Sequence, residues 1–201
     1  MSRQDTKALV HQETKALARE LKTQGTILGG FVATIWVLEV VDIFLGGALN
    51  RYGILPRNLI GLRGILFAPF LHGNFAHLIA NTIPFLTLGW FVMLRETSDF
   101  FVVTGITMLV SGLGVWLFGS AGLHIGASGV VFGYLGFLLA RGYFERNIPS
   151  ILLSVIVGFL YGGAIWGVLP TQPGVSWEGH LFGFIGGVIA ARFLSQRKKV
   201  S

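Results

Sequence analysis

The chain has 201 residues, 53% of them hydrophobic and only 12% charged, with a mean hydropathy of +0.71 and a formal net charge of +6. A soluble domain carries about 25% charged residues and could not bury this much apolar surface, so the composition excludes a soluble globular protein and a disordered chain. The absence of cysteine excludes disulfide frameworks and thiolate metal sites, and the 29 glycines fit closely packed transmembrane helices.

The first 25 residues carry both signs of charge, which is not the pattern of a signal peptide. Val10, Leu17 and Leu21 recur on one helical face. This spacing predicts a short amphipathic helix on the cytosolic surface, and a frayed tail is the alternative interpretation. We therefore expect residues 1–25 to form a cytosolic N-terminal segment ahead of a membrane domain at 26–195.

Gaps between charged residues indicate the spans, because a membrane-crossing helix needs about 20 apolar residues. Residues 64–94 and 147–177 each contain 31 residues without a charge, and residues 100–140 contain 41, enough for two helices separated by the turn-like segment 119–124. The predicted fold class is an all-α membrane protein, a bundle of six transmembrane helices. These are expected at 26–46, 75–94, 100–118, 127–142, 149–169 and 178–195.

Two of these helices are short for a bilayer, and one connection is long. Only 13 uncharged residues follow Glu178, which is too few to cross a bilayer. We therefore expect Glu178 itself to lie at or below the membrane surface, in a wet cavity. The helix at 127–142 is expected to begin inside the bilayer. The segment 47–74 is the longest stretch predicted as non-helical, and its Leu, Ile and Phe residues predict an external loop that dips into the interface.

Lysine and arginine residues predict the orientation, because cytoplasmic loops carry most of them. With the N-terminus in the cytosol, twelve of the fifteen lie on the cytosolic side, and only Arg51, Arg57 and Arg63 lie outside. We therefore expect cytosolic termini, an even number of spans and a basic cytosolic tail at 196–201. Because the charges lie at helix ends and not in one patch, nucleic-acid binding is not expected.

Polar side chains at membrane depth are costly, so they indicate candidate functional sites. His77 and Asn81 are four residues apart and share a helix face, and His72 lies just before that helix. An interhelical hydrogen bond could explain each histidine. A zinc site is a further interpretation, but no carboxylate accompanies the histidines in the same helix and no HExxH motif is present.

Ser128 lies in the motif Gly126-Ala127-Ser128-Gly129, at the expected start of a helix. Unpaired backbone N–H groups and the positive end of the helix dipole can stabilise an oxyanion there. A small residue that permits close helix packing is the alternative interpretation.

Glycines recur at helical spacing beside Ser128 and His180, and these stripes predict that the two helices approach closely. The stripes consist of Gly129, Gly133 and Gly136 on one helix and Gly179, Gly183 and Gly187 on the other. A close approach could bring the Ser128 hydroxyl within hydrogen-bond reach of His180, as base-assisted nucleophilic catalysis requires. Glu178 is two positions from His180 and points elsewhere on the helix, so we predict a Ser–His dyad without a third member.

Glu39 and Asp42 share a face of the first helix. Their functional interpretation is a proton or cation path. We favour the alternative, a paired and partly wet position near the outer end of the helix, with Arg51 or Arg63 as the partner.

The combined pattern resembles the rhomboid intramembrane serine proteases. The resemblance covers roughly residues 30–195. Its motifs are His72-x4-His77-x3-Asn81, then Gly126-x-Ser128-Gly129, then Gly179-His180-x2-Gly183-x3-Gly187.

The resemblance implies a six-helix rhomboid-like bundle and an endopeptidase that cuts transmembrane segments. Ser128 would be the nucleophile and His180 the general base, while the side chains of His77 and Asn81 and the Ser128 N–H would form the oxyanion hole. The supporting residues would be His72, Phe132, whose ring would pack on that of His180, and Gly126. No cofactor or metal is implied. The partners would be single-span membrane substrates and lipid, and the location a bacterial cell membrane.

Two departures from the family pattern and two rival functions accompany this interpretation. A Trp-Arg pair that is frequent in the first external loop is replaced here by Leu62-Arg63, and Gly179 replaces an alanine. The rival functions are an inactive rhomboid-like protein that binds membrane clients and a small transporter that uses Glu39 and Asp42. Oligomeric state and substrate are not predicted.

Overall fold

The computed structural model describes residues 3–171 and 174–197, and every regular element in these ranges is a helix. The predicted all-α architecture is therefore confirmed. The first part of the chain forms α1 (Arg3–Phe44), η1 (Ala48–Tyr52), η2 (Leu59–Arg63), α2 (Gly64–Phe67) and η3 (Ala68–Phe70). The second part forms α3 (Phe75–Met93), α4 (Thr97–Phe118), α5 (Ser128–Glu145), α6 (Ile148–Tyr161), η4 (Gly162–Val168) and α7 (Trp177–Arg197).

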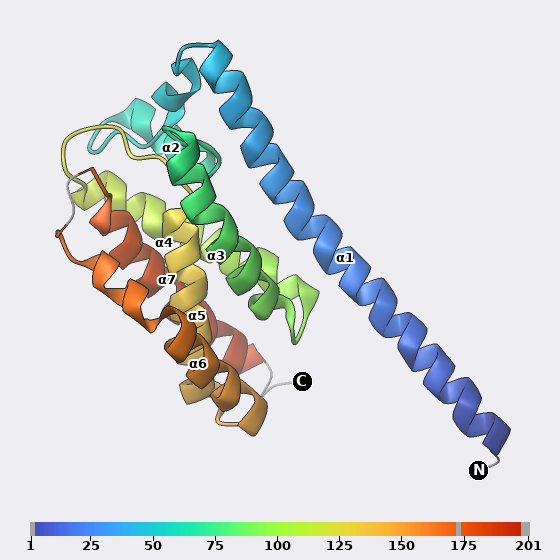
Figure 1. Cartoon of the computed structure of the whole chain (residues 1–201). Coiled ribbons are helices and arrows are strands. Elements are labelled where there is room, and N and C mark those ends of the chain that lie inside the picture. Colours follow the sequence, from blue (N-terminus) through green and yellow to red (C-terminus); the bar gives the residue numbers. More distant parts are fainter. Residues whose placement is uncertain (1–2, 172–173, 198–201) are drawn as a thin grey trace.

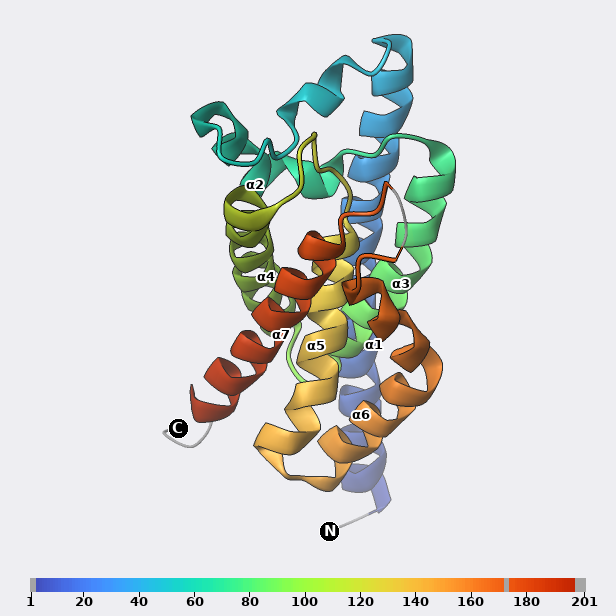
Figure 2. The same ribbon diagram turned by 90° about the vertical axis from the view of Figure 1, so that its left-hand side faces the viewer.

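Helix α5 is the centre of the bundle and contacts α3, α4, α6 and α7 (Figures 1 and 2). Its side chains Tyr134, Phe137 and Leu138 are almost completely buried and form the middle of the core. Burial on all sides explains why α5 can be apolar around most of its circumference. The outer helix α1 packs on α3 with its later turns, and its first turns extend away from the bundle (Figure 1).

Helix α1 differs from the predicted arrangement of its segment. Residues 3–25 are helical, but they form neither a separate amphipathic helix nor a frayed tail, because α1 continues without a break to Phe44. The segment before Gly25 is rich in Ala, Leu, Lys, Glu and Gln, which favour helix, and contains no glycine or proline. Val10, Leu17 and Leu21 are exposed on this extension.

The connection between α1 and α3 also differs from the prediction, because most of it consists of short helical turns. The side chain of Asn58 caps η2 by accepting a hydrogen bond of 2.9 Å from the Ile60 N–H. Gly64 lies against the backbone of Gly53 and Ile54, where a Cβ atom would overlap with backbone atoms. These local contacts fold an apolar segment that has no helical periodicity of its own.

Four helices in the described part of the chain are long and apolar enough to cross a membrane: α1, α3, α4, and α6 together with η4. Both α5 and α7 fall outside this group. Their lengths are 18 and 21 residues, but α5 carries Arg141 and Glu145 and α7 carries Glu178, His180 and Arg192. The predicted number of six spans therefore stays a prediction.

The predicted close approach of α5 and α7 is confirmed. A Cβ atom on Gly183 would overlap with the Gly129 carbonyl oxygen, and one on Gly187 would overlap with the Gly133 carbonyl oxygen. A Cβ atom on Gly136 would overlap with the backbone of Phe184. The two helix backbones are therefore in contact along the glycine stripes, and this contact sets the spacing between the helices that carry Ser128 and His180.

Replacing Gly183 with alanine is expected to destabilise the fold by about 1–3 kcal/mol, because the added methyl group must push the two helix backbones apart. The measurement is thermal unfolding in detergent. The matched control is Gly105→Ala on α4, where nothing lies within 4 Å of the added Cβ. Because alanine favours helix over glycine by about 1 kcal/mol, the control should melt at the same temperature or higher. Equal melting temperatures for both variants would contradict a backbone contact at Gly183.

Candidate active site

A cavity of about 780 Å³ opens where the first turns of α3, α5 and α7 converge. Such a volume is in the range of small-molecule and peptide sites. Five of the residues predicted for the site line this cavity: His77, Asn81, Ser128, Phe132 and His180. The fold therefore brings together side chains that are up to 103 positions apart in the chain (180 − 77).

Ser128 is the first residue of α5 and is half-buried. At this position the backbone N–H groups of the first turn have no partner within the helix. The chain reaches Ser128 through Gly126, whose φ angle of 116° is rarely adopted by other residues. A Cβ atom there would lie 2.5 Å from Cε1 of His77. Glycine at this position therefore permits close contact between the His77 ring and the segment that leads to Ser128.

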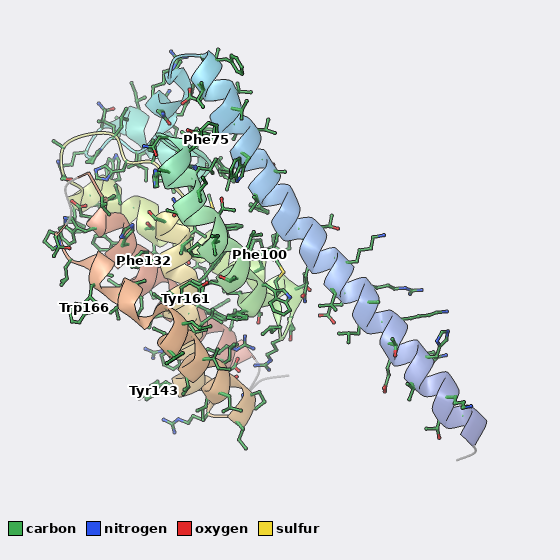
Figure 3. The ribbon with its side chains drawn as sticks, viewed as in Figure 1. Phe75, Phe100, Phe132, Tyr143, Tyr161 and Trp166 are labelled. Carbon is green, nitrogen blue, oxygen red and sulfur yellow. The ribbon has the colours of Figure 1, made fainter. Side chains whose placement is uncertain are left out.

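The ring of His180 is held by a hydrogen bond and by a stacked aromatic ring. Its Nδ1 lies 2.8 Å from the Gly167 carbonyl oxygen, which can only accept, so Nδ1 carries the proton of the neutral ring. This leaves Nε2 as the acceptor. The Phe132 ring stacks on the imidazole, with 4.0 Å between the ring centroids and an interplanar angle of 5°. Figure 3 labels Phe132 on α5. The packing implied by the family resemblance is therefore present.

The Ser128 hydroxyl and the His180 ring both line the cavity, but they are not hydrogen-bonded to each other in this structure. Hydrogen bonds between catalytic groups are often long or poorly aligned before substrate binds and tighten in the complex. The Ser–His dyad therefore stays a prediction.

The first two turns of α3 present His77 and Asn81 to the cavity. Asn74 caps the helix by accepting a hydrogen bond of 2.8 Å from the His77 N–H. The Asn81 amide donates one hydrogen bond of 3.1 Å to the His77 carbonyl oxygen. Since the amide nitrogen carries two protons, one N–H remains for a ligand in the cavity.

His72 lies just before α3 and is 2% exposed. Its Nε2 faces the backbone N–H of Ala127 at 3.4 Å, and its ring packs edge-on against His77 with 4.9 Å between centroids. Burial, and to a lesser extent the neighbouring His77, lowers the pKa of His72 to about 4. The ring is therefore neutral at pH 7, and its Nε2 can accept from the residue that precedes Ser128.

A zinc site is one interpretation of His72 and His77, but the described residues provide no set of ligands for it. Among the described residues, no group of three or more His, Cys, Asp or Glu side chains is placed to hold a metal ion. His72 and His77 are in contact with each other and with the segment before Ser128.

The predicted arginine partners of Glu39 and Asp42 are wrong. The Asp42 carboxylate accepts a hydrogen bond of 2.6 Å from the Leu49 N–H and thereby closes the turn after α1. Arg51 and Arg63 instead lie over the Tyr52 ring, with guanidinium carbons 5.3 and 4.4 Å from its centroid. The two guanidinium groups therefore stabilise the connection between α1 and α3. Glu39 is 4% exposed, and its Oε2 has no hydrogen-bond partner in the described part of the chain.

A second set of polar residues lies beside the cavity: Glu178, which the sequence indicates, and His124 and Ser176, which it does not. His124 is 9% exposed, and its Nδ1 lies 2.7 Å from the Ser176 hydroxyl. Glu178 is 2% exposed and accepts a hydrogen bond of 2.8 Å from the Ser120 N–H. The Glu178 carboxylate is hydrogen-bonded to Ser120 and not to His180, and it is buried beside the cavity and does not lie in it, so the predicted wet position is wrong. The signal for His124 is a histidine in the short connection between two apolar helices, where the sequence predicts only a turn.

The family is decided by comparison with known proteins. A family model described as the rhomboid domain matches residues 61–197, which is more than half of the chain. The chain belongs to the rhomboid family. The matched range runs from η2 to the end of α7 and contains all of the predicted site residues.

Bacterial and plant proteins are similar to this rhomboid. An uncharacterized protein of Mycobacterium tuberculosis is 44% identical over 180 residues, which are 85% of this chain and 75% of that protein. An uncharacterized protein of Mycobacterium leprae is 41% identical over 85% of this chain and 71% of its own length. RHOMBOID-like protein 4 of Arabidopsis thaliana is 32% identical over 62% of this chain and 32% of its own length.

Proposed function

We propose that this rhomboid is an intramembrane serine endopeptidase that cleaves transmembrane segments of single-span membrane proteins. The observation that carries the proposal is that Ser128 and His180, on two helices in backbone contact, line one cavity with His77 and Asn81. The orientation of His180 supports it further, because the Gly167 carbonyl occupies Nδ1 and leaves Nε2 free to accept a proton.

In the proposed reaction the Ser128 hydroxyl attacks the carbonyl carbon of the substrate peptide bond, and its proton passes to Nε2 of His180. The C–N bond then breaks, and the imidazolium gives this proton to the leaving amine. Ser128 is left as an ester of the N-terminal product. Water in the cavity attacks the ester, with His180 again as the base, and releases the carboxylate product.

The proposed oxyanion hole consists of the free N–H of Asn81, the His77 ring and the backbone N–H of Ser128. Donors that are already aimed at the developing negative charge stabilise the transition state without reorganisation. No third acid is required in this scheme, because the Gly167 carbonyl and the Phe132 ring hold the imidazole in place.

The proposal is tested with wild type and Ser128→Ala in liposomes that contain a panel of single-span proteins. Wild type should release cleaved fragments and should react with a fluorophosphonate probe, and Ser128→Ala should do neither. A wild-type protein that binds panel members but neither cleaves them nor reacts with the probe would favour the inactive client-binding alternative. Uptake of a cation that survives Ser128→Ala and fails in Glu39→Gln would favour the transporter.

We further propose that α5 and α7 complete a set of six spans and that both termini are cytosolic in a bacterial cell membrane. The twelve-to-three division of Lys and Arg supports this orientation. The chain contains no cysteine, so a single introduced cysteine shows on which side of the membrane its position lies. Lys15→Cys tests the N-terminal segment, and Leu59→Cys tests the connection between α1 and α3. In intact cells an impermeant thiol reagent should label position 59 and not position 15. Labelling at position 15 would reverse the topology and the side from which substrate is cut.

A further inference from the structure

We infer that Glu178 and His124 are positioning residues, which join the segment leading to Ser128 to the first turn of the helix carrying His180. This inference rests on the proposed function. Hydrogen bonds connect the segment 119–126 to residues 176–179. These bonds, with the bonds that the same side chains make within each segment, are here called the latch.

The first contact of the latch is made by Glu178, the second residue of α7. Its Oε1 accepts the hydrogen bond of 2.8 Å from the Ser120 N–H, and its Oε2 is buried without a hydrogen-bond partner in the described part of the chain. A carboxylate is favoured at a helix N-terminus, but burial without full pairing is costly. A carboxylate buried at this cost in the same turn as His180 indicates a role in placing that turn.

The second contact is made by His124 and Ser176. The Ser176 hydroxyl accepts a hydrogen bond of 3.3 Å from the Gly179 N–H, which is the contact that a serine makes when it caps a helix. The same hydroxyl lies 2.7 Å from Nδ1 of His124, whose Nε2 lies 2.9 Å from the Ser120 carbonyl oxygen. Because that carbonyl can only accept, Nε2 donates, and in the neutral ring Nδ1 accepts the Ser176 proton.

The segment that receives these contacts is itself anchored. His124 and Ile54 exchange two backbone hydrogen bonds of 2.9 Å, and the Gly126 N–H donates to the Ala68 carbonyl oxygen at 2.9 Å. Ser128 follows two residues after Gly126. The latch therefore ties the start of α7 to a segment whose far end is the nucleophile.

The latch acts at the start of α7, ahead of the contacts that Gly183 and Gly187 make with α5. Further along, Gly183 and Gly187 lie against the backbone of α5, which sets the helix spacing there. His180 lies before this contact, in the first turn. The Gly179 carbonyl also accepts a hydrogen bond of 2.9 Å from Ser111 on α4, so the turn is held from two sides.

Replacing Glu178 with alanine is expected to lower kcat about 10²-fold with little change in KM, because a shift of about 1 Å between reacting groups has an effect of this size. Glu178→Gln keeps an oxygen that can accept from Ser120, so it should stay within a few-fold of wild type. His124→Ala should behave like Glu178→Ala. If Glu178→Gln loses as much activity as Glu178→Ala, or if neither loses any, the positioning role is wrong.

A distance measurement tests the latch independently of catalytic activity. Cysteines at Val175 and Tyr143, which are 38% and 68% exposed, carry spin labels near the start of α7 and near the end of α5. Figure 3 labels Tyr143. The distribution of distances between the two labels should be narrow in the labelled protein without further substitution and in labelled Glu178→Gln. It should be broader or shifted in labelled Glu178→Ala. An unchanged distribution in Glu178→Ala would overturn the inference. If the distribution changes but no variant, wild type included, cleaves any substrate, the latch stands and the proposed function fails.

The matched control is Ser154→Ala between α5 and α6. Its hydroxyl accepts from the Gly142 N–H at 3.0 Å and donates to the Leu138 carbonyl oxygen at 2.6 Å, away from the cavity. Loss of these bonds should lower the melting temperature and leave kcat and the label distances unchanged. If the control reproduces the effects of Glu178→Ala, those effects come from general destabilisation and the positioning role is wrong.

Discussion

Replacing His180 with alanine is expected to abolish cleavage of a transmembrane substrate, with a loss of several orders of magnitude in kcat. The proposed base accepts the Ser128 proton during attack and returns it to the leaving amine, and removing one member of such a unit removes nearly all base-assisted catalysis. The protein should still fold, because the helix spacing is set by the glycine contacts of α5 and α7 and not by this ring. Single-turnover cleavage in liposomes and thermal unfolding in detergent are the measurements.

The matched control for this variant is His11→Ala, which removes an imidazole from the exposed extension of α1. It should retain wild-type cleavage. If His180→Ala cleaves at a rate near wild type, the assignment of His180 as the base is wrong, and another group must take the proton. If it does not fold, Ser128→Ala still tests the same reaction, because a serine at the cavity wall is small and half-buried.

Replacing Asn81 with alanine is expected to lower kcat about 10²–10³-fold, or roughly 2.7–4 kcal/mol, with little change in KM. Asn81 lines the cavity, and its second amide N–H is not used in the hydrogen bond to His77. This N–H is proposed to stabilise the oxyanion, which exists only in the transition state and the intermediates next to it. Labelling by a highly reactive fluorophosphonate should be less affected, since that probe needs less help from the oxyanion hole. Steady-state cleavage and probe labelling are measured on the same preparation.

The matched control for Asn81 is Asn147→Ala at the start of α6. Asn147 caps that helix by accepting a hydrogen bond of 3.0 Å from the Ser150 N–H, and loss of such a cap costs about 1 kcal/mol of stability. This control should melt earlier and keep its kcat. If Asn81→Ala behaves in the same way, Asn81 is a packing residue, and the oxyanion role rests on His77 and the Ser128 backbone.

Most helices could be predicted from the sequence, because the positions of charged residues and the length of the apolar runs between them can be read directly from the chain. The predicted segments 75–94 and 100–118 agree with α3 and α4 to within three residues at each end. The predicted start of the first long helix at residue 26 is wrong, because the charged residues before it do not end α1. Charge opposes membrane insertion, whereas helix formation depends on backbone propensity, so a helix can continue into water past the end of a span.

For the candidate site, spacing predicts that His77 and Asn81 share a helix face and that the glycine stripes bring Ser128 near His180. Only the resemblance to the rhomboid family joins these two pairs in one site. The tertiary structure alone decided how those side chains are held. The partner of Nδ1 of His180 is a carbonyl 13 residues away, and the partner of Glu178 is an N–H 58 residues away. Neither is part of a periodic pattern, because a single backbone group becomes available only when a turn or a helix end leaves it unpaired. The orientation of the proposed base and the latch beside it therefore follow from the packing of the whole bundle.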